Sequence, residues 1–193
     1  MKRLAVYCGS ATPADPVYIE TARYVGRTLA ERGIGVVYGG GRLGLMGALA
    51  DAALAAGGEV TGVIPEGLVS TEVAHQGLTA LHVVSGMHER KRLFTDLSDG
   101  FLTIAGGVGT MDELWEAISW AQLGYHRNPV GLLNTAGFYN DLIAFHRRMV
   151  EVGFIRPAHA DILIVDAGID ELLGKMANHR PHEPLFAMKA GDL

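Results

Sequence analysis

Hydrophobic residues along the chain fall into short continuous runs, separated by longer stretches in which they recur every three or four positions. Short apolar runs bounded by glycine or polar residues are typical of buried strands, and the longer spacing is typical of amphipathic helices. The runs predict strands at residues 4–8, 35–38, 60–64, 81–84, 100–104, 130–133 and 162–165. The helical spacing predicts helices over residues 17–32, 45–56, 87–97, 111–123 and 139–152.

This alternation predicts an α/β protein with a mostly parallel sheet of about seven strands and helices on both faces. We expect residues 1–180 to form a single Rossmann-like domain and residues 181–193 to form an irregular tail. Right-handed crossovers bring the carboxyl ends of parallel strands to one edge of the sheet, where ligands bind. Three loops are predicted at this edge: Gly9-Ser10, Gly39-Gly40-Gly41 and the loop 106–110.

The loop 106–110 joins the predicted strand 100–104 to the helix that follows. Its members are Gly106, Gly107, Val108, Gly109 and Thr110. Glycines let backbone N–H groups approach a ligand, and a helix N-terminus adds unpaired donors and partial positive charge. The loop is therefore a candidate phosphate-binding site, with Thr110 as N-cap and its hydroxyl free to reach a phosphate oxygen.

Glu113 follows this loop and has two interpretations. The spacing Thr110-x-x-Glu113 fits a capping box, in which the carboxylate accepts a hydrogen bond from the backbone N–H of Thr110. Alternatively, a carboxylate one helical turn beyond a phosphate site is within reach of a bound ribose. The two roles are compatible.

The second glycine-rich loop, from Gly39 to Gly44, matches the G-x-G-x-x-G string of dinucleotide-binding proteins. That fingerprint normally follows the first strand and is paired with an acidic residue near the end of the next strand. Here the string follows the second predicted strand, and the acidic candidate, Glu66, comes late and after Pro65. A mononucleotide phosphate or a tight crossing of the backbone explains these glycines equally well.

The predicted helix 87–97 carries cations on a face that is otherwise apolar. Residues 87, 90, 91, 94 and 97 share this face, which places Arg90 and possibly Lys91 among apolar neighbours. A buried guanidinium is costly unless an acid or a ligand anion pairs with it. We therefore interpret Arg90 as a site residue; the alternative is a partly exposed face on which the cations form a solvated ridge.

Two motifs make the chain similar to the Lonely-guy (LOG) family of cytokinin riboside 5′-monophosphate phosphoribohydrolases. Residues 106–113, Gly-Gly-Val-Gly-Thr-Met-Asp-Glu, resemble the family's P-G-G-x-G-T-x-x-E motif, and residues 87–91, Met-His-Glu-Arg-Lys, resemble its M-x-x-R-K motif. Segments at 7–10, 38–47, 62–65 and 120–124 extend the resemblance over nearly the whole chain. One departure is Ala105, where the family usually has proline; it loosens the loop entry slightly and removes no ligand contact.

The resemblance implies hydrolysis of the N-glycosidic bond of an adenosine-type 5′-monophosphate, N6-modified or plain, with release of the base and ribose 5-phosphate. It assigns catalysis to Arg90 and Glu113. Substrate binding is assigned to Glu72, Met87, Lys91, the loop 106–110 and Ser119. Glycoside cleavage builds positive charge on the sugar, which a carboxylate near the ribose stabilises. Arg90 fixes that carboxylate, holds the substrate or assists the departing base.

Neither a cofactor nor a metal is expected. The histidines are scattered, and His179-x-x-His182 contains Pro181, so these two side chains cannot share a helix turn. A pyridoxal-phosphate decarboxylase, a label that relatives have carried, needs a Schiff-base lysine, and Lys91 is the sole candidate. A non-catalytic nucleotide-binding module would keep the glycine loops without needing Arg90 and Glu113, so the presence of both favours catalysis.

Composition limits the partners and the cellular compartment that we expect for this protein. The formal charge of −5 over 193 residues argues against nucleic acid or an anionic membrane surface as a partner. Cys8 is the only cysteine, and residues 1–10 contain too short an apolar run for a signal peptide, so we expect a soluble cytoplasmic protein. The resemblance implies a homodimer or higher homo-oligomer, for which the helix around Trp115, Ile118 and Trp120 is either a contact surface or core.

Overall fold

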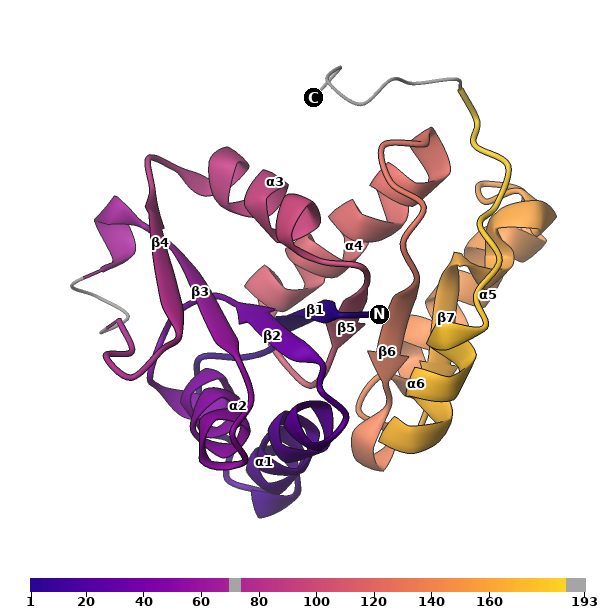
Figure 1. Cartoon of the computed structure of the whole chain (residues 1–193). Helices are drawn as coiled ribbons and strands as arrows, with labels where there is room; N and C mark the ends of the chain where they lie inside the picture. The colour runs from indigo at the N-terminus through magenta and orange to yellow at the C-terminus, as the bar shows by residue number, and fades with distance from the viewer. Residues whose placement is uncertain (70–73, 187–193) are drawn as a thin grey trace.

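The computed structural model describes residues 1–69 and 74–186, and within them seven strands form one parallel sheet (Figure 1). The strands lie in the order β4-β3-β2-β1-β5-β6-β7. Their bounds are β1 Arg3–Tyr7, β2 Gly35–Tyr38, β3 Val60–Pro65, β4 Ala80–Val84, β5 Phe101–Thr103, β6 Val130–Leu133 and β7 Leu163–Asp166. The predicted α/β fold class is confirmed, and each of these strands ends within one residue of its predicted position.

Helices cover both faces of the sheet, as predicted. In Figure 1, α1 and α2 lie on one side of the strands and α3 and α4 on the other. The α-helices of the described residues are α1 Pro16–Glu31, α2 Gly44–Ala55, α3 Met87–Leu97, α4 Val108–Leu123, α5 Asn140–Glu151 and α6 Ile169–Ala177; short 3-10 helices are η1 Glu66–Leu68, η2 Thr135–Gly137 and η3 Pro157–Ile162. Helix α6 is the one that the hydrophobic spacing did not predict.

Helices α1 and α2 pack unusually close together. Asp15 caps α1 by accepting a hydrogen bond from the backbone N of Val17 at 2.9 Å, and Pro16 fixes the first turn. On the buried face of α1, a Cβ on Gly26 would fall well inside 3.0 Å of the carbonyl oxygen of Leu49 in α2. The glycine therefore sets the distance between the two helices, and with it the position of the loop that leads into α2.

The connections reverse direction at β1, which pairs with β2 on one side and with β5 on the other. Such a switch point opens a crevice outside the carboxyl ends of the strands, because the loops on its two sides leave in opposite directions. The backbone N of Gly9 donates to the carbonyl of Ala105 at 3.1 Å, which joins the loop after β1 to the loop after β5. The fold thus brings two of the three predicted loops together at one edge.

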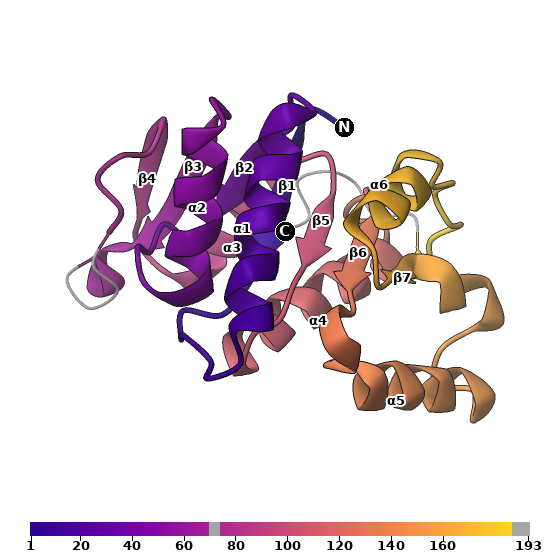
Figure 2. The ribbon, with the colours of Figure 1, turned by 90° about the horizontal axis from the view of Figure 1, so that it is seen from below.

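The periphery of the fold carries α5 and the last described residues. Residues 179–186 form neither helix nor strand, and the backbone N of Leu185 donates to the carbonyl of Gln122 at 2.8 Å. Figure 2 shows α5 at the outer margin, on the side of β7. Among the described helices, none has the length and apolar character needed to cross a bilayer.

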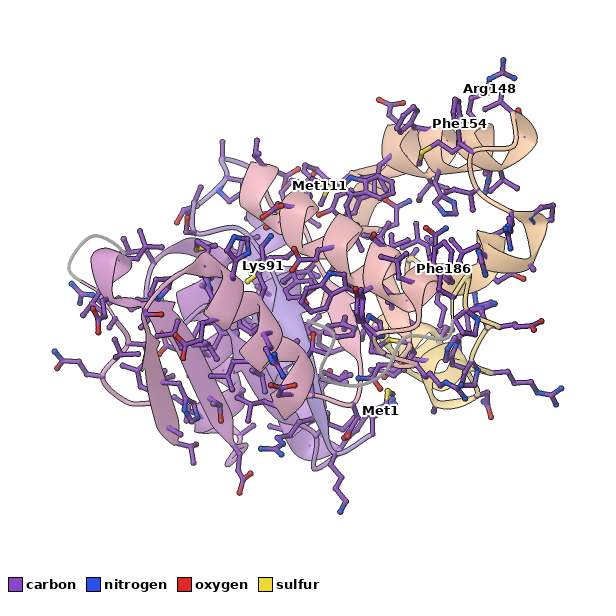
Figure 3. All side chains as sticks on the ribbon, turned by 90° about the horizontal axis from the view of Figure 1, so that it is seen from above. Met1, Lys91, Met111, Arg148, Phe154 and Phe186 are labelled. Carbon is purple, nitrogen blue, oxygen red and sulfur yellow. The ribbon has the colours of Figure 1, made fainter. Side chains whose placement is uncertain are left out.

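The helix around Trp115, Ile118 and Trp120, which the sequence leaves open as contact surface or core, is buried only in part, since both tryptophans are half-buried. Ile118 is buried, and Trp115 packs against the core cluster below α4. Exposed phenylalanine side chains lie elsewhere, at Phe138 before α5, Phe145 within it and Phe154 after it. Figure 3 shows Phe154 pointing away from the sheet at the outer end of this region.

Candidate active site

A cavity of about 360 Å³ opens at the carboxyl edge of the sheet, at the switch point. Its lining comes from the loops after β1 and β5, from α3 and from the start of α4. The described residues that line it are Cys8, Gly9, Ser10, Ala11, Met46, Leu68, Met87, Arg90, Gly107, Val108, Gly109, Thr110, Asp112 and Glu113. A larger cavity of about 790 Å³ lies between α5 and β7, and its described lining contains none of the predicted site residues.

Arg90 reaches this cavity from the buried face of α3. Its side chain is 4% exposed, so it does not belong to a solvated ridge. The guanidinium carbon lies 5.4 Å from the centre of the Phe94 ring, and Nη1 lies 3.9 Å from the Sδ of Met87. Its Nε has no hydrogen-bond partner among the described residues, which leaves a buried donor for a ligand acceptor.

Glu113 faces Arg90 from α4. Its Oε1 lies 3.9 Å from the Nη2 of Arg90, and the Glu113 side chain is 9% exposed. The two charges thus meet in a setting nearly closed to solvent, where each needs the other to offset its desolvation. The structure brings together the two residues to which the family resemblance assigns catalysis.

The predicted capping box between Thr110 and Glu113 is wrong. Helix α4 begins at Val108, with the extended residue Gly107 as N-cap and no side-chain cap bond, so Thr110 lies inside the first turn. A Cβ on Gly106 would fall well inside 3.0 Å of the Thr110 Oγ1, so the Thr110 side chain packs directly over that glycine. A Cβ on Gly107 or Gly109 would meet no described atom within 4 Å, so these two glycines leave open space beside the start of the helix.

This start aims the N-terminus of α4 into the cavity. The first backbone donors of a helix have no partner within it, and they carry the positive end of the helix dipole. Gly107, Val108, Gly109 and Thr110 all line the cavity. The arrangement can bind a phosphate or another anion next to Glu113.

Lys91 occupies a different position from its neighbour Arg90. Its Nζ lies 2.9 Å from the Oδ2 of Asp112 and 2.9 Å from the Oε2 of Glu116, so it ties α3 to α4. Figure 3 shows Lys91 and Met111 on these two helices. Burial lowers the pKa of Lys91, but the hydrogen bonds to the two carboxylates outweigh it and the pKa is raised.

The other predicted residues are distributed unevenly. Met87, Gly9 and Ser10 line the cavity, whereas Ser119 is exposed on α4 and is not among the described lining residues. Glu72 lies outside the described residues. Gly39, Gly40 and Gly41 follow β2 and are also not among the described lining residues. Within the described part of the chain, no group of three or more His, Cys, Asp or Glu side chains is placed to hold a metal ion.

Sequence reasoning missed the apolar lining. Met46 and Leu68 contribute to the cavity from α2 and η1. Cys8 lies at the end of β1, and burial, with a smaller contribution from the charge of Glu113, raises the pKa of its thiol far above the usual range. A thiol held protonated is a poor nucleophile, so Cys8 is poorly suited to nucleophilic chemistry in this cavity. The position of Cys8 at the end of the first predicted strand is the feature of the sequence that indicates a place in the cavity.

The fold and the site together define a Rossmann-like α/β protein with an anion-binding helix N-terminus and a buried arginine–glutamate pair. Residues 46–176 match a family model described as "Possible lysine decarboxylase". The chain is 42% identical over 180 residues to the cytokinin riboside 5′-monophosphate phosphoribohydrolase LOG7 of Arabidopsis thaliana, covering 93% of this chain and 83% of that one. It is 40% identical to LOG1 of the same plant, covering 100% and 91%, and 43% identical to LOG of Oryza sativa, covering 93% and 74%. The chain therefore belongs to the LOG family of phosphoribohydrolases, which are N-glycosidases.

Solved structures with less similar sequences share the fold alone. The molybdenum cofactor carrier protein of Chlamydomonas reinhardtii superposes with a TM-score of 0.64 at 20% identity, over 91% of this chain and 94% of that one. The molybdenum cofactor binding protein of Rippkaea orientalis gives 0.65 at 18% identity, over 91% and 95%. The same architecture thus serves proteins with different ligands.

The lysine-decarboxylase description conflicts with the environment of Lys91. A Schiff-base lysine needs a lowered pKa and access to its substrate. Lys91 has a raised pKa, is paired with two carboxylates and is not among the described residues that line the cavity. The geometry favours glycosidase chemistry over a lysine-based mechanism.

Proposed function

We propose that this protein hydrolyses the N-glycosidic bond of adenosine-type 5′-monophosphates, N6-modified or plain, and releases the free base and ribose 5-phosphate. One observation carries the proposal. Arg90 and Glu113 meet in a cavity that also receives the N-terminus of α4, so a phosphate site and a charged pair share one small space. The names of the relatives, which act on a riboside 5′-monophosphate, support the same substrate class.

The phosphate binds at the first turn of α4, through the backbone donors of the loop 106–110 and the hydroxyl of Thr110. This contact is remote from the bond that breaks. Its binding free energy positions the ribose against Glu113, which lies one turn further along the helix. The base then points toward the apolar part of the lining, where Met46, Leu68 and Met87 lie.

Glu113 acts on the ribose. As the C1′–N bond breaks, its electron pair leaves with the base nitrogen and positive charge grows on the sugar, which the carboxylate stabilises. An oxygen from water bonds to C1′, and the proton that the water loses ends on the base. A buried carboxylate is suited to orient that water or a ribose hydroxyl, because little bulk solvent competes for it.

Arg90 lies close enough to Glu113 to aim its carboxylate. The separation of 3.9 Å between Nη2 and Oε1 exceeds a hydrogen bond, so a substrate hydroxyl can approach from the side and hydrogen-bond to both groups. The unpaired Nε of Arg90 offers a donor to the substrate. Glu72, Lys91 and Ser119 remain predicted substrate contacts, from the resemblance.

We further propose a cytoplasmic homodimer or higher homo-oligomer. The resemblance suggests self-association, and the exposed side chains of Phe138, Phe145 and Phe154 offer apolar surface for a protein contact. Size-exclusion chromatography with light scattering tests this, because a monomer at micromolar concentration would contradict it.

Release of the free base, monitored by chromatography, tests the activity. The substrates are AMP, isopentenyladenosine 5′-monophosphate and the matching nucleosides without phosphate. We expect release from the monophosphates, little from the nucleosides, loss in Arg90→Ala and retention in the surface control Arg92→Ala. A folded protein that binds AMP but releases no base from either monophosphate would instead be a nucleotide-binding module.

A further inference from the structure

The glycine-rich loop after β2 has a role that phosphate binding does not explain. Residues 39–44 match a nucleotide-binding string, yet none of them is among the described residues that line the cavity. Backbone conformation explains the glycine at two of these positions, since Gly40 and Gly44 have φ values of +78° and +59°. Gly39 is not among the described glycines with positive φ, so its backbone suits any residue.

The constraint at Gly39 is one of space. A Cβ there would fall well inside 3.0 Å of the Nη2 of Arg90, a separation that real Cβ atoms essentially never show. The next nearest atoms belong to Met46, with Cε at 3.0 Å and Sδ at 3.2 Å. The thioether end of a methionine is flexible and can move aside. The guanidinium is therefore the group that needs a glycine at this position.

Arg90 has little freedom to move away. Its side chain is 4% exposed, its guanidinium lies over Phe94, and its Nη1 is 3.9 Å from the Sδ of Met87. The atom that would clash with the new Cβ is Nη2, and Nη2 is also the atom that lies 3.9 Å from Glu113. Any shift that relieves the clash therefore changes the geometry of the arginine–glutamate pair.

We propose that Gly39 is a positioning residue for Arg90: the first glycine of the loop leaves the space in which the guanidinium lies, and so fixes Nη2 against Glu113. The loop then serves the arginine sterically, and phosphate binding is left to the start of α4. The kinetic part of this proposal rests on the proposed function. The packing part does not, because it concerns only the fit between two residues.

The experiment is a double-mutant cycle of Gly39→Ala and Arg90→Ala, read by thermal unfolding and by the kinetics of base release. Gly39→Ala alone is expected to lower Tm by about 3–10 °C, as overpacking does in a domain of this size. In the Arg90→Ala background the same change is expected to have almost no effect on Tm, because the guanidinium is gone. Gly174→Ala is the control for an added methyl group without a clash: no described heavy atom outside its own helix lies within 4 Å of the new Cβ, and Tm is expected to rise rather than fall.

Kinetics provide the second measurement. We expect Gly39→Ala to lower kcat about tenfold to a hundredfold, as a small misplacement of a catalytic group does, with KM nearly unchanged. Three results would overturn the proposal. One is a fall in Tm of equal size in both backgrounds, and another is a Gly39→Ala enzyme with wild-type Tm and kcat. The third is recovery of the Tm of Gly39→Ala by Met46→Ala in place of Arg90→Ala. If Arg90→Ala does not fold, Arg90→Lys replaces it, because lysine has no Nη2. If the wild type releases no base, the proposed function fails while the Tm cycle still decides the packing claim.

Discussion

The Nη2 of Arg90 lies 3.9 Å from the Oε1 of Glu113, and these side chains are only 4% and 9% exposed. Two helices meet through this pair, since Arg90 belongs to α3 and Glu113 to α4. A buried charge that loses its partner keeps its desolvation cost without the compensating attraction. The pair is therefore structural and chemical at once, and its disruption has separable effects on stability and on rate.

Removal of the Arg90 guanidinium is expected to destabilise the fold. In Arg90→Met, the Glu113 carboxylate loses this buried partner, so the free energy of unfolding should fall by about 3 kcal/mol. Combining it with Glu113→Gln should recover part of that loss, because the carboxylate that faced Arg90 is then replaced by a neutral amide. Urea unfolding measures both, and a double variant less stable than Arg90→Met would contradict the account.

Arg92 supplies the matched control for that measurement. Its Nε lies 3.6 Å from the Oδ2 of Asp96, with both side chains about half exposed. Arg92→Met should change the free energy of unfolding by less than about 0.5 kcal/mol, because water screens such surface pairs.

Lys91 should affect the rate more than substrate binding. Lys91→Met leaves Asp112 and Glu116 without the ammonium that lies 2.9 Å from each, so α4 can shift relative to α3. We expect kcat to fall about tenfold while KM changes less than about threefold. Steady-state kinetics separate the two constants. A raised KM with unchanged kcat would show that Lys91 contacts the substrate, as the family resemblance implies.

Two glycines in helices should respond oppositely to alanine. Gly26→Ala places a Cβ against the backbone of Leu49, which cannot move alone, and should cost about 2–3 kcal/mol. Gly174→Ala adds a methyl group where no described atom outside its helix lies within 4 Å, and should raise stability by about 0.5–1 kcal/mol. Denaturant unfolding of both variants checks the signs. A stable Gly26→Ala protein would mean that α1 and α2 can separate without cost.

Stability should fall on mild acidification because of His126. Burial, above all, lowers its pKa from 6.5 to about 4. Its neutral form is fixed by two hydrogen bonds: Nε2 donates to the carbonyl of Ala117 at 2.9 Å, and Nδ1 accepts from the backbone N of Asn128 at 3.2 Å. Between pH 6.5 and pH 4 the His126 of the unfolded chain binds a proton that the folded chain does not bind. The free energy of unfolding therefore falls as the pH drops through this range.

The full loss from this one group is on the order of 3 kcal/mol. Burial also lowers the pKa values of His146 and His179, which act in the same direction. Urea unfolding at several pH values measures the slope, and His126→Gln should flatten it. An unchanged slope in that variant would assign the acid sensitivity to other groups.

The sequence predicted what depends on local pattern. Strands such as Gly35–Tyr38 and Val130–Leu133 are short, wholly apolar runs, so their bounds followed directly. Arg90 was recognisable because a cation on an apolar helix face needs a partner. Its pairing with Glu113, more than twenty positions away, followed only from the family resemblance.

The features that sequence did not predict arise from tertiary contacts. Helix α4 starts at Val108, and no capping side chain marks that start in the sequence. The need for glycine at position 39 comes from an arginine some fifty residues away, which the G-x-G-x-x-G string does not reveal. The contribution of Met46 and Leu68 to the cavity likewise depends on how α2 and η1 pack.

If the Glu113 carboxylate drives base release from a phosphate-anchored substrate, its removal should slow the chemical step and leave substrate binding intact. The most direct measurement is single-turnover release of adenine from AMP by the wild type and by Glu113→Gln, with AMP affinity measured by calorimetry on both. We predict that the release rate falls at least about a hundredfold while the Kd stays within about threefold, because the phosphate contacts are intact. A Glu113→Gln protein that releases adenine at the wild-type rate would contradict the account.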